Sequence, residues 1–127
     1  MPATPSADIP QFGVRSERGP DDVCVVRVVG SEVDMSHEEE LRAELRRAVA
    51  SEAPGLVVDL TECEFIDSSG VRALLLSREA QNGGEDGDRL AVAASSDQIL
   101  RILSGLGLDK VIPIRPTVEE AAGALSG

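Results

Sequence analysis

The chain of 127 residues contains no tryptophan and no tyrosine, and its two phenylalanines are the only aromatic side chains. Leucine, valine, isoleucine and alanine must therefore fill the interior, and an apolar content of 42 % is enough for a packed core. Many proteins that bind single-stranded nucleic acid stack bases on aromatic rings, so this shortage argues against that class. The length suits one domain with one core.

Basic residues are also few, since 12 Lys and Arg stand against 23 Asp and Glu and the formal net charge is −11. Such a surface repels DNA, RNA and anionic lipid; solubility and a basic protein partner both remain explanations for it. No apolar stretch approaches the roughly 20 residues of a membrane span, and the N-terminal segment has no signal-peptide pattern. We therefore expect a cytoplasmic protein that binds neither nucleic acid nor membrane.

Cysteine and histidine are scarce as well. Cys24 and Cys63 lie in apolar, strand-like runs without a CxxC pair, which predicts buried thiols in a reducing cytosol and no zinc site. The single histidine, His37, is expected to be a solvated residue in the first turn of a helix. We expect no metal and no cofactor.

Short apolar runs alternate with segments of helical periodicity. The pattern predicts strands over residues 11–17, 23–30, 56–61, 89–94 and 111–114, and helices over residues 36–50, 69–81, 95–106 and 117–125. Strands that alternate with helices indicate a largely parallel sheet, while the turn sequence RGPDD closes an N-terminal hairpin with an antiparallel edge. We therefore expect an α/β fold with a mixed, mostly parallel β-sheet, a flexible tail over residues 1–10 and one domain over residues 11–127.

Local patterns refine these elements. Three helix starts carry a capping-box pair, namely Ser36/Glu39, Ser95/Gln98 and Thr117/Glu120. The apolar helix stripes expected to be buried comprise Leu41, Leu45, Ala48 and Val49; Ile99, Ile102, Leu103 and Leu106; and Val118, Ala121, Ala122 and Leu125. Residues 23–30 are nearly all apolar, which predicts a strand covered on both faces, and Pro113 predicts an edge strand.

The segment Asp67-Ser68-Ser69-Gly70 separates an apolar run from the second predicted helix. Ser, Asp and Gly are preferred helix caps, so capping alone explains the segment. A helix start also offers free N–H groups and partial positive charge, so a phosphate on a serine there could be accommodated without unfolding. Gly70 would permit close approach by another molecule, because no side chain shields its backbone.

Two enzymatic alternatives fit poorly. A hydrolytic Ser68 would need a base, but His37 is expected on another helix and no GxSxG or SxxK motif is present. A receiver-type acceptor at Asp59 would need Asp21 and Asp22 as a metal pair, yet these two residues precede their strand instead of ending it.

Three stretches in order carry a resemblance to a known family: VVRVVGSEVDMSHEEELRAEL, LVVDLTECEFIDSSGVRALL and LAVAASSDQILRILSGLGLDKVIPI. They resemble the anti-sigma factor antagonists, the single-domain STAS proteins of bacterial partner-switching systems, over residues 11–125. The resemblance implies that the unmodified protein binds an anti-sigma factor that is also a serine kinase of the histidine-kinase-like ATPase fold, and so frees a sigma factor. The kinase then phosphorylates the antagonist and ends binding, and a metal-dependent serine phosphatase restores it.

Within this resemblance, Ser68 matches the phosphorylated serine, and Asp34, Asp67, Ser68, Ser69 and Gly70 match the partner-binding surface. One residue departs from the family pattern, because Ser31 stands where a glycine usually precedes Glu32. The protein is expected not to be an enzyme. Two rival functions remain: a STAS subunit of a lipid-transport ATPase complex, and a small hydrolase that uses Ser68.

Overall fold

The computed structural model describes residues 13–125 apart from 31, 34–37, 52 and 82–88. Five strands form the main sheet in the order β1-β2-β4-β6-β7. They are β1 (Gly13–Arg18), β2 (Cys24–Val29), β4 (Leu56–Asp59), β6 (Leu90–Ala93) and β7 (Ile114–Arg115). Only β1 runs antiparallel to its neighbour, so the predicted α/β class with a mixed, mostly parallel sheet is confirmed.

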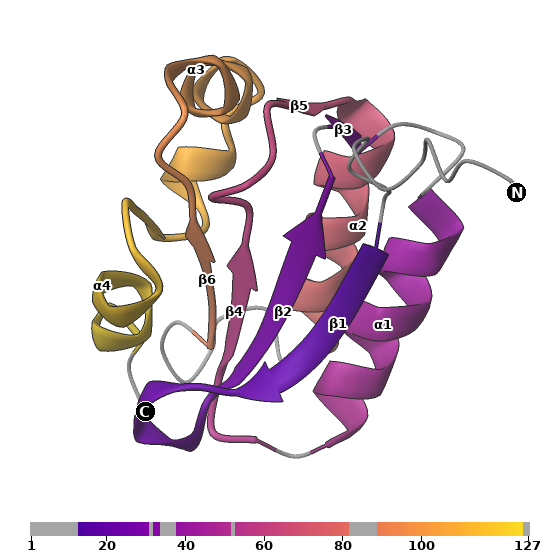
Figure 1. The fold of residues 1–127 in the computed structure, drawn as a ribbon, viewed down its shortest axis with the longest axis vertical. Coiled ribbons are helices and arrows are strands. Elements are labelled where there is room, and N and C mark those ends of the chain that lie inside the picture. Colours follow the sequence, from indigo (N-terminus) through magenta and orange to yellow (C-terminus); the bar gives the residue numbers. More distant parts are fainter. Residues whose placement is uncertain (1–12, 31, 34–37, 52, 82–88, 126–127) are drawn as a thin grey trace, which may run out of the picture.

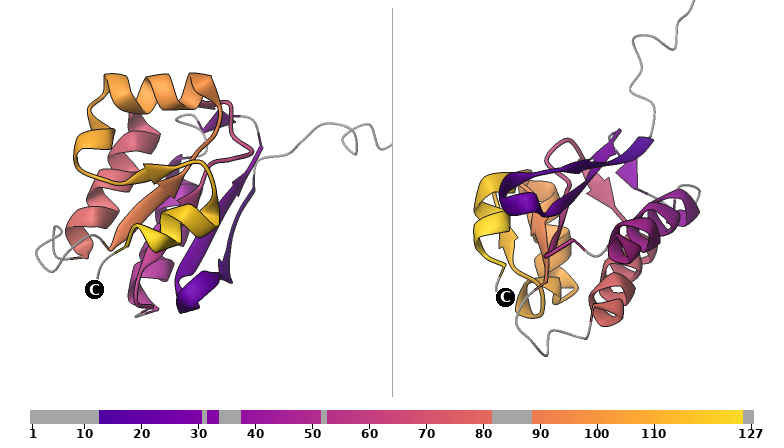
Figure 2. Two further views of the ribbon diagram at one scale, coloured as in Figure 1. Left: turned by 90° about the vertical axis from the view of Figure 1, so that its left-hand side faces the viewer. Right: turned by 90° about the horizontal axis from the view of Figure 1, so that it is seen from below.

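Helices cover both faces of this sheet (Figures 1 and 2). They are α1 (Glu38–Ala50), α2 (Ser68–Ala80), α3 (Asp97–Gly105) and α4 (Val118–Gly123), with short 3-10 turns at Pro20–Asp22 and Leu108–Lys110. In the right-hand view of Figure 2, α4 lies on one side of the sheet and α1 and α2 lie on the other. A second, two-stranded parallel sheet pairs β3 (Glu32–Val33) with β5 (Phe65–Ile66) beside the start of α2.

Two apolar clusters account for this layering. Val26, Val58 and Val92 point toward α1, α2 and α3, whereas their sequence neighbours Val57 and Ala91 point toward α4. Successive strand residues face opposite sides of a sheet, so near-continuous apolar runs suit strands that are covered twice. The prediction that both faces of β2 are covered holds in part, since Cys24, Arg27 and Val29 are only half-buried.

The first hairpin closes through a left-handed turn. Asp21 and Asp22 have φ values of 56° and 64°, and the Val23 N–H donates to the Pro20 carbonyl at 3.2 Å. Two successive residues at positive φ suit the right-handed twist of the strands they join. The predicted RGPDD turn is therefore confirmed.

The N-cap of α4 is the residue predicted from the sequence, whereas the N-cap of α3 is not. Thr117 caps α4 by accepting from the Glu120 N–H at 3.1 Å, as predicted. The cap of α3 is Ser96, which accepts a long 3.4 Å bond from the Ile99 N–H, so the predicted Ser95/Gln98 pair is wrong by one residue. The Ser36 cap lies outside the described residues.

Three further expectations need correction. Leu106 is 53 % exposed because α3 ends at Gly105, which leaves the leucine outside the buried stripe. The last strand covers Ile114–Arg115 and not residues 111–114, although it does lie at the sheet edge. Cys24 is half-buried, whereas Cys63 is buried as predicted.

The predicted apolar stripe of α1 is buried at Leu41, Leu45 and Ala48 and half-buried at Val49.

Candidate functional site

The segment Asp67–Gly70 lies at the end of the molecule where the parallel strands finish. Strand β5 leads directly into α2, and the β3–β5 pair lies beside this junction (Figure 1). In open α/β sheets, functional residues gather in the loops that follow the carboxyl ends of the strands. The fold thus places the segment where a second molecule can reach it.

Asp67 is the N-cap of α2, with extended backbone angles of φ −95° and ψ −177°. Its Oδ1 atom accepts from the Ser69 N–H at 3.0 Å, the Gly70 N–H at 3.2 Å and the Ser69 hydroxyl at 2.6 Å. Three donors on one carboxylate oxygen fix the first turn of the helix. The capping interpretation is confirmed for this residue, and the cap occupies the hydroxyl of Ser69.

Ser68 is the first residue of α2 and is exposed, whereas Ser69 is half-buried. The Ser68 hydroxyl has no hydrogen-bond partner among the residues that the structure describes. A helix of 13 residues begins at this point, and its aligned peptide dipoles give the terminus partial positive charge, which the Asp67 carboxylate partly offsets. Of the two adjacent hydroxyls, Ser68 is therefore the one available to another molecule.

Gly70 is buried in the first turn of α2. The expectation that another molecule approaches its backbone closely does not fit this placement. Its amide instead contributes to the cap, because it donates to both the side chain and the carbonyl of Asp67. Asp34, Ser31 and His37 lie outside the described residues, so their roles stay predictions.

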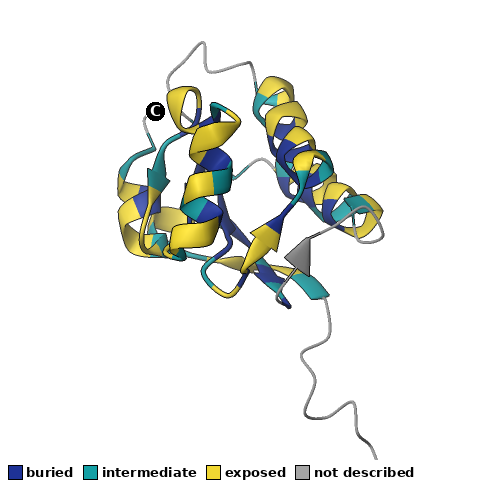
Figure 3. Ribbon diagram, turned by 90° about the horizontal axis from the view of Figure 1, so that it is seen from above, coloured by how far each residue is buried: buried dark blue, intermediate teal, exposed yellow. Residues whose placement is uncertain are grey.

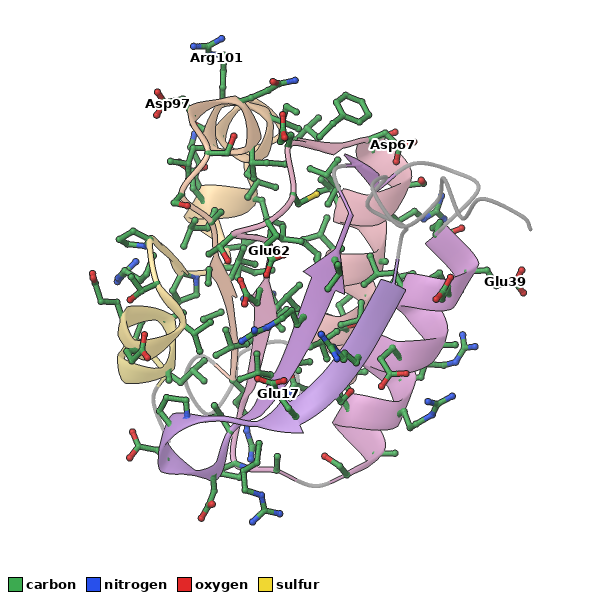
Figure 4. The ribbon with its side chains drawn as sticks, in the orientation of Figure 1. Glu17, Glu39, Glu62, Asp67, Asp97 and Arg101 are labelled. Atoms are coloured by element: carbon green, nitrogen blue, oxygen red, sulfur yellow. The ribbon has the colours of Figure 1, made fainter. Side chains whose placement is uncertain are left out.

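Two acidic residues lie in or just before the junction, Asp67 and Glu64. Figure 4 shows Asp67 at the start of α2, at the upper end of the molecule, and Glu39 lower down, near the start of α1. Glu64, three residues before Asp67, is exposed. A further negative charge at Ser68 would therefore lie next to these carboxylates, at the positive terminus of α2 and one helical turn from Arg72.

Asp59, the candidate receiver aspartate, is buried at the end of β4. Its Oδ1 atom accepts from the Thr61 hydroxyl at 2.7 Å and the Thr61 N–H at 3.0 Å. Its Oδ2 atom forms an ion pair with Arg27 Nε at 3.2 Å, but the angles of this contact are not those of a hydrogen bond. Asp21 and Asp22 lie in the hairpin turn, before β2, and the described residues contain no group of three or more potential metal ligands. Asp59 thus has a structural role in the described part of the chain.

The cysteines are not disulfide-bonded. Cys63 is buried and its thiol donates to the Phe65 carbonyl at 3.2 Å. Burial raises the pKa of Cys24 above the ordinary thiol value; a hydrogen bond with Ser16 lowers it, and the nearby Glu44 carboxylate raises it further. A thiol of raised pKa is a poor nucleophile and a poor metal ligand at neutral pH.

None of the described helices is both long enough and apolar enough to span a bilayer. The candidate site thus consists of an exposed serine at the start of a helix, next to the aspartate that caps this helix, on a domain with a mixed β-sheet.

The chain belongs to the STAS domain family, whose model matches residues 16–121. A proposed anti-anti-sigma factor of Mycobacterium tuberculosis is 35 % identical over 96 residues, which make up 74 % of this chain and 64 % of that protein. The chain thus spans less than two thirds of the length of this curated relative.

Solved structures agree with the family assignment. The crystal structure of an anti-sigma factor antagonist from Mycobacterium paratuberculosis is 34 % identical, with a TM-score of 0.79 over 91 % of this chain and 94 % of that one. An anti-sigma-factor antagonist (STAS) domain protein from Planctomyces limnophilus shares the fold at 20 % identity, with a TM-score of 0.71 over 87 % of this chain and 95 % of that one. The resemblance noted in the sequence is confirmed.

Proposed function

We propose that this protein is an anti-sigma factor antagonist, which binds an anti-sigma factor and thereby releases a sigma factor. Membership of the STAS domain family supports the proposal, as do two relatives above 30 % identity that carry this description. The observation that carries it is the exposed Ser68 hydroxyl, free of described partners at the start of α2, beside a second hydroxyl that the cap already uses.

In the proposed cycle the anti-sigma factor is also a serine kinase of the histidine-kinase-like ATPase fold. The Ser68 oxygen forms a bond to the γ-phosphorus of ATP, ADP leaves, and the hydroxyl proton passes to a group of the kinase. A metal-dependent serine phosphatase later hydrolyses the phosphoserine. Both enzymes belong to the partners, so this chain needs no catalytic group or cofactor of its own, and the cycle operates in the cytoplasm.

Electrostatics make a phosphate at Ser68 a sufficient switch. It adds about −1.5 to −2 charges to a protein with a formal net charge of −11. A charge left buried and unpaired at an interface costs on the order of 2–5 kcal/mol. With about 1.4 kcal/mol for each factor of ten, this cost would lower the affinity by a factor of between roughly 30 and several thousand. No change of fold is required.

The proposal is tested with the kinase-type anti-sigma factors encoded in the genome of the same organism. Each is purified, incubated with this protein and ATP, and the phosphosite is located by peptide mass spectrometry. We expect one kinase to modify Ser68, to modify a Ser69→Ala variant at Ser68 as well, and to bind Ser68→Ala without modifying it. Phosphorylation confined to another residue, or co-purification with membrane transporter components and with no anti-sigma factor, would contradict the proposal.

A further inference from the structure

Most of the exposed large apolar side chains lie on α2 or next to it. The large apolar residues exposed in the described part of the chain are Phe65, Leu75, Leu76, Leu106 and Val111. Leu75 and Leu76 lie on α2 itself, at 37 % and 43 % exposure, and Phe65 lies in β5, which leads into it. Val111 lies beside α2, because Arg78 Nε of that helix donates to its carbonyl at 3.0 Å. Contiguous exposed apolar surface on a soluble domain commonly marks an interaction site.

The helical period places the two leucines on the same face as the serine. With about 3.6 residues per turn, Ser68, Arg72, Leu75, Leu76 and Glu79 fall on one side of α2. All five are exposed, whereas the opposite side of the helix is buried against the core (Figure 3). The exposed face therefore starts at the serine and continues through a cation to a pair of leucines.

A hollow adjoins this face. About 290 Å³ lies between α1 and α2, lined by Arg42, Arg46, Val49, Ala73, Leu76, Ser77 and Ala80. It is large enough for one side chain of a partner, with apolar walls and two guanidinium groups. The Arg72 side chain, on the neighbouring exposed face, has no hydrogen bond or ion pair with any described residue. Three arginines thus lie near the leucines, of which Arg42 already pairs with Glu38 at 3.2 Å, while the exposed Glu79 follows the leucines on the same face.

We infer that the outer face of α2, defined here as Ser68, Arg72, Leu75 and Leu76, is the surface that docks the anti-sigma factor. This inference rests on the proposed function and specifies the chemistry of the partner. The facing segment presents apolar side chains to Leu75 and Leu76, and a carboxylate to Arg72, which has no ion pair with a described residue. Apolar contact supplies affinity, and the opposed charges set orientation and association rate.

The test uses the anti-sigma factor found to bind the unmodified protein, with dissociation constants from isothermal titration calorimetry. We expect a Leu75→Ser/Leu76→Ser double variant and an Arg72→Glu variant each to weaken binding by about tenfold or more, as truncation of central contacts does. Arg18→Glu is the matched control. It makes the same charge change on an exposed residue at the far end of the first hairpin, and it should alter the constant by less than about twofold.

Thermal unfolding separates a binding defect from a folding defect, because exposed residues can be changed with little effect on stability. The inference is overturned if the double variant and Arg72→Glu, both folded, bind as tightly as the unmodified protein. If Ser68→Glu abolishes binding in that same experiment, the proposed function survives and the docking surface ends at the serine. If the unmodified protein binds no anti-sigma factor of its organism, the proposed function and this inference fail together.

Discussion

The Ser69 hydroxyl donates a 2.6 Å hydrogen bond to Oδ1 of Asp67, the residue that caps α2. This bond distinguishes two neighbouring serines that the sequence leaves equivalent. Ser69 belongs to the cap and Ser68 projects into solvent, so the two hydroxyls should respond differently to substitution.

Removal of the cap should cost stability, whereas removal of the exposed hydroxyl should not. Asp67→Ala deletes the acceptor of three hydrogen bonds, and we expect it to lower the free energy of unfolding by about 1–2 kcal/mol. Ser68→Ala is the control and should change it by less than about 0.5 kcal/mol. Urea unfolding monitored by circular dichroism measures both. Equal losses in the two variants would show that Ser68 also has a buried partner.

Phosphorylation of Ser68 should stabilise the folded domain. The phosphate would lie at the positive end of α2 and one helical turn before Arg72, within reach of its guanidinium. We expect a gain of about 1 kcal/mol, seen as a higher melting temperature of the phosphorylated protein. Arg72→Ala should reduce this gain. A melting temperature that does not change on phosphorylation would rule out both contacts.

The Arg27–Asp59 pair should stabilise the sheet without serving the site. The Asp59 side chain is 5 % exposed and that of Arg27 is 33 % exposed, so Arg27→Met leaves a buried carboxylate without its cation. We expect a loss of about 3 kcal/mol in the free energy of unfolding. Asp59→Asn added to Arg27→Met should recover part of the loss, because the amide carries no charge and its oxygen can still accept from Thr61. If the double variant instead loses the sum of the unfolding free energies lost by Arg27→Met and by Asp59→Asn alone, the two side chains do not interact.

Cys24 should be slow to alkylate. Because burial raises its pKa, less thiolate is present at a given pH in the folded protein than in the unfolded chain. The rate of reaction with iodoacetamide, followed by peptide mapping, should therefore reach half its maximum at a higher pH when the protein is folded. Glu44→Gln removes a carboxylate that raises the pKa and should move the profile toward lower pH. Identical profiles for folded and urea-unfolded protein would be inconsistent with this burial.

The sequence predicted the elements well where local chemistry determines them. Thr117 and the RGPDD turn form as their residue types require, and the parallel order follows from strands that alternate with helices. The errors fall where two neighbouring residues compete for one role. Ser95 and Ser96 are both suitable caps, and the structure uses Ser96.

The same limit applies to the candidate site. Spacing located the Asp67–Gly70 segment, but it could not show which hydroxyl the aspartate engages or that Gly70 is buried. The outer face of α2 was missed altogether. The run Leu74-Leu75-Leu76 was the available indication, because three successive leucines cannot all face one core from a helix.

The most direct test is the affinity of the anti-sigma factor for this protein before and after phosphorylation of Ser68, measured by titration calorimetry at one salt concentration. The switch proposed at α2 predicts that the phosphorylated form binds at least about 30-fold more weakly. Equal affinities of the two forms would contradict it.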